Sequence, residues 1–336
     1  MGPEADLDVV GFGALNLDVI YRVDSVEAAG LEPGREILGW SGDMRHFNHT
    51  LEAHGGPPVS ITPGGSAANT IYALKRMGFR TGYIGAVGEG EVGDRLIEGL
   101  GDPVDLGVVR RGSSGSTIIA VGPDGDRSIV VFPNANDTFT TRDVDHLLIA
   151  KTRVLHLTSF VGNAPLEAQV EAVARLPQDI KVTLDPGELY AEMGIDGIAP
   201  LLERADVVMP NMGELLKMTG QRTRERAADL LFDLGVETVV CKMGAKGNET
   251  YVRNGSSYNN VGKKYGTKVR GDTVGAGDVA NAGYLAGMVL GLSHIGAGYL
   301  ADECAYSSVG GHGRETYPDK AFLMDKLKYA QAIDRL

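Results

Sequence analysis

The chain of 336 residues is poor in cysteine, tryptophan and basic side chains. Its two cysteines, Cys241 and Cys304, are too few for a disulfide framework or for a zinc site with four cysteine ligands. Both lie in apolar segments, so we expect them to be buried thiols. The 32 lysines and arginines are outnumbered by 44 acidic residues, which gives a net charge of −12. Nucleic-acid binding needs clustered basic residues that neutralise phosphates, and none cluster here.

Long hydrophobic runs are also missing. The most apolar stretch, residues 279–292, contains three glycines and is too short to span a bilayer. The amino-terminal segment MGPEADLD carries three acids and lacks the basic and apolar pattern of a signal peptide. We therefore expect a soluble, cytoplasmic protein that binds neither membranes nor nucleic acids.

Glycine, in contrast, is abundant, with 47 residues, which is about twice the usual share. The glycines form clusters rather than a repeat, which excludes a collagen-like or low-complexity chain. The clusters include Gly64-Gly65, the pair Gly275 and Gly277, and Gly310-Gly311. In a globular chain, clustered glycines make tight turns or let the backbone approach a ligand closely. This composition favours an anion or nucleotide site.

The segment from Gly11 to Asn16 nearly matches the dinucleotide fingerprint G-x-G-x-x-G, but Asn16 stands where the third glycine is needed. Apolar residues then alternate with polar ones over residues 15–23. This two-residue period predicts a strand, not the helix whose amino terminus would hold a pyrophosphate. An NAD-dependent dehydrogenase is therefore only a remote alternative.

The predicted elements describe an α/β protein. We expect residues 24–63 to form strands and loops with no more than a turn near residues 43–53, and residues 117–121 and 128–132 to form a hairpin. A helix is predicted from Ser66 to Gly78, and from residue 143 onward helices alternate with short strands, which indicates a mostly parallel sheet flanked by helices. We expect a large α/β domain of residues 1–15, 64–112 and 139–336. A small β-sheet lid is expected from residues 16–63 and 113–138.

The segment DTVGAGD, residues 272–278, carries the strongest chemical signal. Its glycines come just before an apolar helical run, so their backbone N–H groups lie at a helix amino terminus, where unpaired donors and the helix dipole attract anions. Asp278, in the first turn, would repel a bound phosphate, so an acid at this position indicates a catalytic role. An alcohol placed between the two would give its proton to Asp278 as it attacks the phosphorus.

The segment GGSAAN, residues 64–69, is the second signal. Its glycines and small side chains let a ligand approach the backbone, and the Asn69 amide both donates and accepts hydrogen bonds. Such a group suits adjacent hydroxyls on a sugar ring.

These two segments, in this order, make the chain similar to the ribokinase-like (PfkB) family of carbohydrate and nucleoside kinases over essentially its whole length. DTVGAGD fits the carboxy-terminal signature of that family, and GGSAAN fits the amino-terminal one, with Ile71 where a small residue is usual. Further landmarks follow in the expected order: residues 16–18 (NLD), 134–136 (NAN), 211–214 (NMGE) and 242–247 (KMGAKG).

The resemblance implies a role for each matching residue. Asp278 would be the catalytic base, and the amides of Gly275, Ala276 and Gly277 would form an anion hole for the transferred phosphate. The expected substrate-binding residues are Asp18, Gly64, Gly65, Asn69 and Asn136. The expected ATP-binding residues are Asn211, Glu214, Lys242, Gly244, Gly247 and Gly313. Glu214 would contact Mg²⁺ through water, and Asp272 would border a monovalent cation such as K⁺.

The sequence predicts an ATP- and Mg²⁺-dependent kinase that phosphorylates a primary hydroxyl of a small carbohydrate. A nucleoside kinase of the adenosine type is the alternative, and a catalytically silent sugar-binding protein is a remote one. Asp302 and Glu303 stand where the family usually has small or amide residues beside the adenine pocket, which leaves the choice of phosphoryl donor open. The exposed edges of the lid are also expected to pair in a homodimer.

Overall fold

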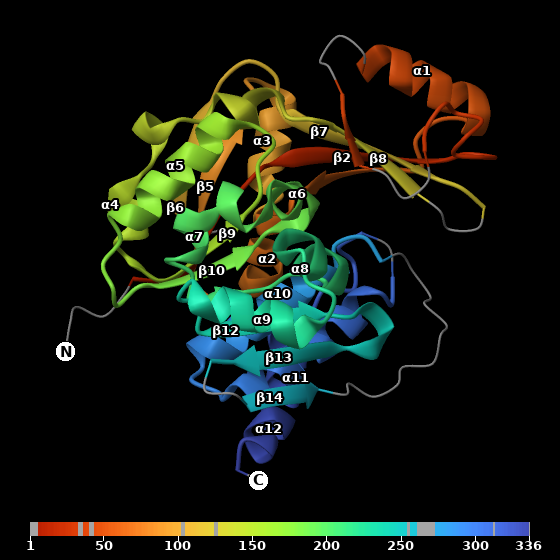
Figure 1. Cartoon of the computed structure of the whole chain (residues 1–336). Coiled ribbons are helices and arrows are strands. Elements are labelled where there is room, and N and C mark those ends of the chain that lie inside the picture. The colour runs from red at the N-terminus through yellow and green to blue at the C-terminus, as the bar shows by residue number, and fades with distance from the viewer. Residues whose placement is uncertain are drawn as a thin grey trace.

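A computed structural model describes residues 6–32, 36–39, 44–101, 105–123, 127–253, 256–260, 273–311 and 313–335. Within these residues the chain builds a large sheet covered by helices on both faces and a second, smaller sheet that projects from one side (Figure 1). This is the ribokinase-like α/β architecture, as the sequence predicted.

The nine described strands of the large sheet lie in the order β14-β13-β12-β11-β10-β9-β1-β5-β6. All neighbouring pairs are parallel except β12–β13 and β13–β14. The chain runs from β1 to β5 and β6 on one side, and then returns to place β9 on the other side of β1. The strands are β1 (Leu7–Phe12), β5 (Thr81–Val87), β6 (Asp105–Arg110), β9 (Thr152–Thr158), β10 (Lys181–Asp185), β11 (Val207–Val208), β12 (Thr238–Lys242), β13 (Asn248–Val252) and β14 (Ser256–Asn260).

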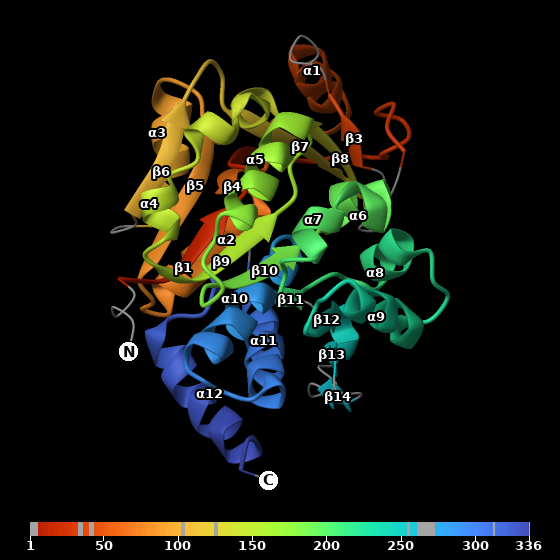
Figure 2. The same ribbon diagram turned by 60° about the vertical axis from the view of Figure 1, so that its left-hand side comes forward.

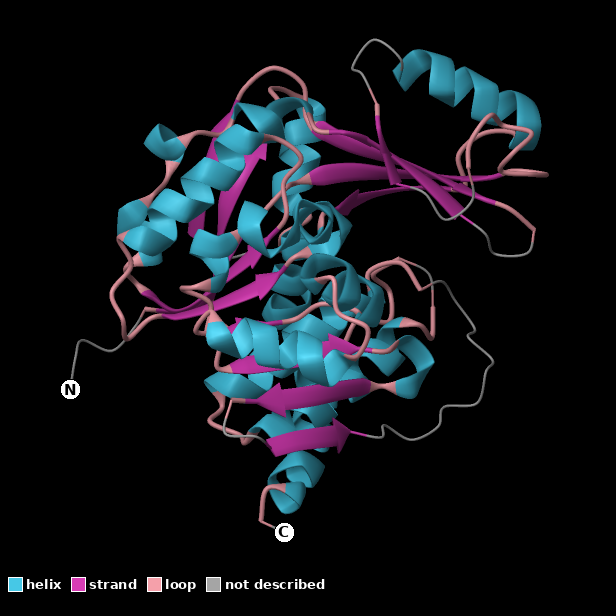
Figure 3. Ribbon diagram, viewed as in Figure 1, coloured by secondary structure: helices cyan, strands magenta, loops and turns pink. Residues whose placement is uncertain are grey.

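Helices form a layer on each face of this sheet (Figures 2 and 3). One layer comprises α4 (His146–Ile149), α5 (Asn163–Ala174), α6 (Gly187–Gly197), α7 (Ala199–Leu202), α8 (Met212–Thr219) and α9 (Arg224–Asp233). The other comprises α2 (Ser66–Arg76), α3 (Glu91–Glu98), α10 (Ala276–Val289), α11 (His294–Ser308) and α12 (Lys320–Ile333). Short 3₁₀ turns occupy Asn134–Thr138, Thr141–Asp143 and Gly244–Lys246.

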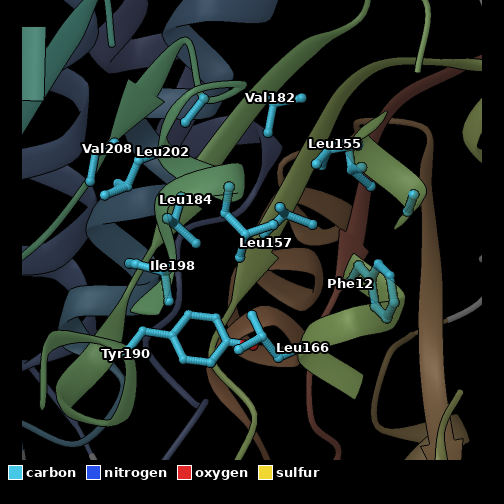
Figure 4. Packing of buried hydrophobic residues seen from close by; sticks show 14 of the residues in the cluster. Phe12, Leu155, Leu157, Leu166, Val182, Leu184, Tyr190, Ile198, Leu202 and Val208 are labelled. Atoms are coloured by element: carbon cyan, nitrogen blue, oxygen red, sulfur yellow. The ribbon is translucent and has the colours of Figure 1, made fainter. Parts of the chain in front are cut away.

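The core under the first layer is built by alternate residues of the central strands. Leu155 and Leu157 of β9 lie beside Val182 and Leu184 of β10, and Tyr190 of α6 belongs to the same cluster (Figure 4). Because successive side chains of a strand point to opposite faces, the residues between these leucines face the α10 layer. Burial on both faces explains why the strands read as continuous apolar runs.

The second sheet has the strand order β3-β8-β7-β2-β4. Its strands are β2 (Asn16–Arg22), β3 (Glu36–Leu38), β4 (Ser60–Gly64), β7 (Gly115–Val121) and β8 (Arg127–Phe132). The β7–β8 hairpin was predicted and is antiparallel as expected. The division of the chain into two domains at the stated boundaries stays a prediction.

One element departs from the expectation for residues 24–63. Residues Met44–Gly55 form a 12-residue helix, α1, rather than a turn. Phe47 and Leu51 of this helix pack against Ile118, Val130 and Phe132 of the second sheet. The helix therefore covers one face of that sheet and gives it a separate hydrophobic core.

No helix among the described residues is long and apolar enough to cross a membrane.

Candidate active site

A cavity of about 1230 Å³ lies between the second sheet and the carboxyl ends of β9 to β12. Open α/β sheets bind ligands at this edge, near the point where the strand order reverses, here between β1 and β9. The volume exceeds that of a typical single-ligand pocket, so donor and acceptor can share it. Its polar lining includes Asn16, Asp18, Asn69, Thr117, Asp185, Asn211, Glu214, Lys242, Asp278, Asn281 and Asp302.

The strand alternation delivers two opposite charges to the floor of this cavity. Leu184 and Cys241 point into the core of the α4–α9 layer, so Asp185 and Lys242, the next residues along each strand, point to the opposite face. That face is covered by α10, which contributes Asn281. The three side chains meet beneath the amino terminus of α10.

Lys242, Asp185 and Asn281 form a closed polar network. The Lys242 ammonium donates to Asp185 Oδ2 at 2.6 Å and to Asn281 Oδ1 at 3.2 Å, and Asn281 Nδ2 donates to the same carboxylate. Burial alone would raise the pKa of Asp185, but the ammonium and the Asn281 amide outweigh it and lower the pKa. Burial likewise opposes the charge on Lys242, yet Asp185 and Glu214 raise its pKa. Both groups are therefore charged at neutral pH.

The amino terminus of α10 is a tight turn that only glycine accommodates. Gly275 precedes the helix with φ +77°, and a side chain there would overlap the Tyr317 hydroxyl. The Ala276 amide makes a long hydrogen bond of 3.3 Å to the Thr273 carbonyl. At Gly277 a Cβ atom would lie 3.7 Å from Lys242 Nζ, which puts the ammonium beside the helix terminus. The helix amides and the ammonium, which is paired with Asp185, thus lie together on this side of the cavity as hydrogen-bond donors that suit an anion.

Asp278 lies in the first turn of α10 and borders the cavity. Its Oδ2 accepts a hydrogen bond of 2.8 Å from Asn69 Nδ2, and its backbone carbonyl accepts one of 3.0 Å from the Thr70 hydroxyl. Burial raises the pKa of the carboxyl group to about 7, against the lowering effect of Asn69. A carboxylate with this pKa is well matched to proton transfer at neutral pH.

Arg314 fixes the orientation of the Asn69 amide. Its Nε and Nη2 donate to Asn69 Oδ1 at 3.0 and 2.8 Å, which leaves Asn69 Nδ2 to face Asp278. The guanidinium also lies 4.7 Å from the centre of the Tyr72 ring. Burial lowers the pKa of Arg314, as expected of a cation held in the interior. The chain Arg314–Asn69–Asp278 thus aligns the carboxylate from behind.

Asp18 enters the cavity from β2 of the second sheet. Burial raises the pKa of its carboxyl group to about 7; Arg314 lowers it and the nearby Asp278 raises it. Gly64 makes room for this side chain, because any Cβ at Gly64 would overlap the carboxylate. A Cβ atom at Gly65, where φ is +105°, would likewise overlap the Ala14 carbonyl oxygen. Both positions of the GGSAAN segment therefore require glycine, because a side chain would clash with a neighbouring group.

Asn136 reaches the cavity wall, but its polar atoms bind the protein. Its Oδ1 accepts from the Leu15 amide at 3.0 Å, and its Nδ2 donates to the Leu15 carbonyl at 3.1 Å and to Asn16 Oδ1 at 2.9 Å. These bonds tie the start of β2 to the segment after β8.

Asn211 and Glu214 cap the amino terminus of α8. The Glu214 amide donates to Asn211 Oδ1 at 2.9 Å, and Glu214 Oε2 accepts from the Asn211 amide at 2.7 Å. Burial and the charge of Asp185 raise the pKa of Glu214 to about 7. One carboxylate oxygen is engaged in the cap, and the side chain lines the cavity. No group of three or more metal-ligating side chains occurs within the described ranges.

The remaining predicted residues are divided between the cavity and its surroundings. Gly244 and Gly247, in the turn after β12, line the cavity beside Asn248. Gly313 and Gly64 do not line it. Gly313 precedes Arg314 in the sequence, and Gly64 lies against the Asp18 carboxylate. Asp272 lies outside the described residues.

Sequence reasoning did not single out Asp185, Asn281 or Arg314. Asn281 could have been found, because it lies three residues after Asp278 and so shares its helix face. Asp185 directly follows a predicted strand, residues 181–184, and the carboxyl end of a strand is a common position for a functional carboxylate. No local signal marked Arg314, which meets Asn69 across 245 residues of sequence.

Comparisons with known proteins agree with this geometry. Residues 43–320 match the family model described as pfkB family carbohydrate kinase. An uncharacterized sugar kinase from Archaeoglobus fulgidus is 33% identical over 250 residues, which cover 73% of this chain and 98% of the relative.

Solved structures share the fold. A probable sugar kinase from Rhizobium etli has a TM-score of 0.84 at 20% identity, covering 97% of this chain and 99% of that chain. Adenosine kinase from Schistosoma mansoni, in complex with 2-fluoroadenosine, has a TM-score of 0.80 at 17% identity, covering 90% of this chain and 95% of that chain. A ribokinase from Arabidopsis thaliana, 22% identical with a TM-score of 0.76, is solved in complex with ribose and ATP, and a putative ribokinase II from E. coli, 22% identical with a TM-score of 0.73, in complex with ATP and Mg²⁺. The chain therefore belongs to the pfkB family of carbohydrate kinases: it is a sugar or nucleoside kinase, a phosphotransferase whose acceptor is a hydroxyl group.

Proposed function

We propose that this kinase transfers the γ-phosphate of ATP to a primary hydroxyl of a small carbohydrate. The observation that carries the proposal is the position of Asp278. Its carboxylate stands between polar groups suited to hydroxyls, Asp18 and Asn69, and the donor groups of Lys242 and the α10 amides, which suit a phosphate. An alcohol and a phosphate that occupied these two sides would meet at the carboxylate.

Each group in the site has a task in the transfer. The acceptor hydroxyl donates its proton to Asp278 while its oxygen forms a bond to the γ-phosphorus. The bond between the γ-phosphorus and the bridging oxygen breaks, and ADP leaves with that oxygen. The amides of Gly275 and Gly277, with the Lys242 ammonium, stabilise the charge on the transferred phosphoryl group.

The residues present fit a nucleotide-bound Mg²⁺. Carboxylate oxygen is a ligand that Mg²⁺ prefers, usually together with phosphate oxygens and several waters. Glu214, which lines the cavity with one carboxylate oxygen free of the helix cap, would hold the ion through water, and the ion would neutralise phosphate charge. A monovalent cation beside Asp272 is part of the proposal as well, by family resemblance.

The test is an ADP-release assay with ribose, fructose, adenosine, cytidine and inosine as acceptors, with Mg²⁺ and K⁺ present. We expect turnover with a sugar in the intact enzyme and its loss in Asp278→Asn. Turnover with none of the five, or undiminished turnover in the variant, would contradict the proposal.

A nucleoside acceptor is the second candidate, and a specific feature favours it. Ile119, Ile129 and Val131 line the cavity from the second sheet, and Phe160 and Leu189 line it from the large sheet's side. Apolar lining of this kind suits the face of a nucleobase better than a bare sugar ring. Turnover with adenosine, cytidine or inosine but with neither sugar would decide for it.

A homodimer through the lid remains part of the proposal. Helix α1 covers one face of the second sheet, and the other face lines the cavity, so association would use the edge strands β3 and β4. Leu38 and Ile61 on these edges are 53% and 38% exposed. We expect sedimentation velocity to give a dimer that Ile61→Lys converts to a monomer; a monomeric parent enzyme would refute it.

A further inference from the structure

The cavity continues past the phosphate site to an end that is formed by α11 and the β12–β13 turn. This end lies away from the second sheet (Figure 1). Small side chains, Ala301 and Ala305, line it together with Gly244 and Gly247. Since the acceptor groups Asp18 and Asn69 lie on the other side of Asp278, the base of the phosphoryl donor belongs here. This assignment rests on the proposed function.

Among the described residues, one carboxylate lines this end of the cavity, that of Asp302 on α11. The residue is only 8% exposed. Its Oδ1 accepts a hydrogen bond of 2.7 Å from Asn248 Nδ2, while its Oδ2 has no hydrogen-bond partner in the described part of the chain. A buried carboxylate oxygen without a donor is costly, and native proteins usually satisfy such atoms. Burial accordingly raises the pKa of Asp302 to about 7.

The neighbouring polar groups do not compete with Asp302 for a ligand. Asn248 Nδ2 also donates to the Gly298 carbonyl at 2.9 Å, which uses its second hydrogen, and its Oδ1 accepts from the Thr250 hydroxyl at 3.3 Å. The next residue, Glu303, is also buried but ion-pairs with Lys326 at 3.0 Å and does not line the cavity. Among the described residues that line the cavity, Asp302 alone has a buried side-chain oxygen without a hydrogen-bond partner.

We propose that Asp302 determines the base specificity of the phosphoryl donor. Its free oxygen accepts a hydrogen bond from the exocyclic amino group of an aminopurine, at C6 in adenine or at C2 in guanine. In its ionised form, which predominates at pH 8, the carboxylate can only accept, so it attracts an amino group and repels a carbonyl oxygen at the same position. Hypoxanthine has the purine shape but neither amino group, and the site discriminates against it.

Calorimetric titration of the full chain with Mg²⁺ and ADP, GDP or IDP tests this without an acceptor. A lost hydrogen bond to a buried charged group corresponds to about 10-fold to 100-fold in affinity. We expect IDP to bind at least about tenfold more weakly than whichever of ADP and GDP binds more tightly. Tighter binding of ADP would place the recognised amino group at C6, and tighter binding of GDP would place it at C2. Asp302→Ala should bring the ratio to within about twofold, whereas Glu303→Gln, a neighbouring buried carboxylate, should keep it.

Equal binding of IDP by the parent protein, or an unchanged ratio in folded Asp302→Ala, overturns the inference, as does binding of none of the three. If the alanine variant does not fold, Asp302→Asn, which keeps the shape and weakens the acceptor, must lower the ratio. Discrimination among the nucleotides with no transfer to any of the five acceptors would leave the inference standing and remove the proposed function.

Discussion

Replacement of Asp278 by asparagine should strongly lower the turnover number and should abolish its increase between pH 6 and pH 8. Burial holds the pKa of this carboxyl group at about 7. The group accepts a proton only when it is ionised, so about 10% of the enzyme is active at pH 6 and about 90% at pH 8. The turnover number kcat of the parent enzyme should therefore rise about tenfold across this range. Asparagine keeps the shape and the contact with Asn69 but cannot take the proton, and the loss of a general base costs about 10²–10⁴ in rate.

The measurement is kcat from pH 5.5 to 8.5 at saturating ATP and acceptor. Saturation matters because Asp18 also has a pKa of about 7, and its titration should change acceptor binding, which appears in KM. We expect Asp278→Asn to give a low rate that does not change over this range, and Asp18→Asn to keep the acid limb in kcat. A rate within tenfold of the parent enzyme, or an acid limb that persists in Asp278→Asn, would refute the assignment of the base.

Two further variants test the floor and the acceptor side of the site. Lys242→Met leaves the Asp185 charge buried without its partner, so urea unfolding should show a loss of about 3–5 kcal/mol in the free energy of unfolding; an unchanged value would mean that the ion pair is not formed. Gly64→Ala puts a methyl group against the Asp18 carboxylate, and overpacking of this kind costs about 1–3 kcal/mol. The acceptor kcat/KM should fall about 10-fold to 100-fold with nucleotide affinity unchanged, and an equal loss in both would contradict the placement of Asp18.

The sequence predicted the large sheet well because its strands and helices are locally consistent. The helix from Ser66 and the β7–β8 hairpin are confirmed, since periodicity and turn residues act within a dozen residues. Helix α1 was missed. Its apolar positions Met44, Phe47 and Leu51 do recur at helical spacing, but three histidines and flanking glycines obscured them. The helix is stabilised by packing on the second sheet, which is tertiary information.

The residues of the candidate site also differ in whether they could be predicted from local sequence. Asp278 and the glycines before it could be predicted because helix entry, anion binding and the carboxylate are all contained in one short segment. Asp185 meets Lys242 across 57 residues, and Arg314 meets Asn69 across 245. Such pairs depend on how distant strands, helices and turns are arranged in the fold, and a single sequence does not carry that arrangement. The roles of the predicted residues stay predictions until the variants are measured.

The independent core beneath α1 has a mechanical consequence. Leu51, Ile118 and Val130 belong to a cluster that is separate from those of the large sheet, so the second sheet is stiff in its own right. It joins the rest of the molecule where Asn136 crosslinks the start of β2 and where Leu17 of β2 packs on the core of the α2–α10 layer. A movement of this sheet that carried Asp18 toward or away from Asp278 would leave the packing beneath α1 intact, so substrate entry and product exit need not unfold it.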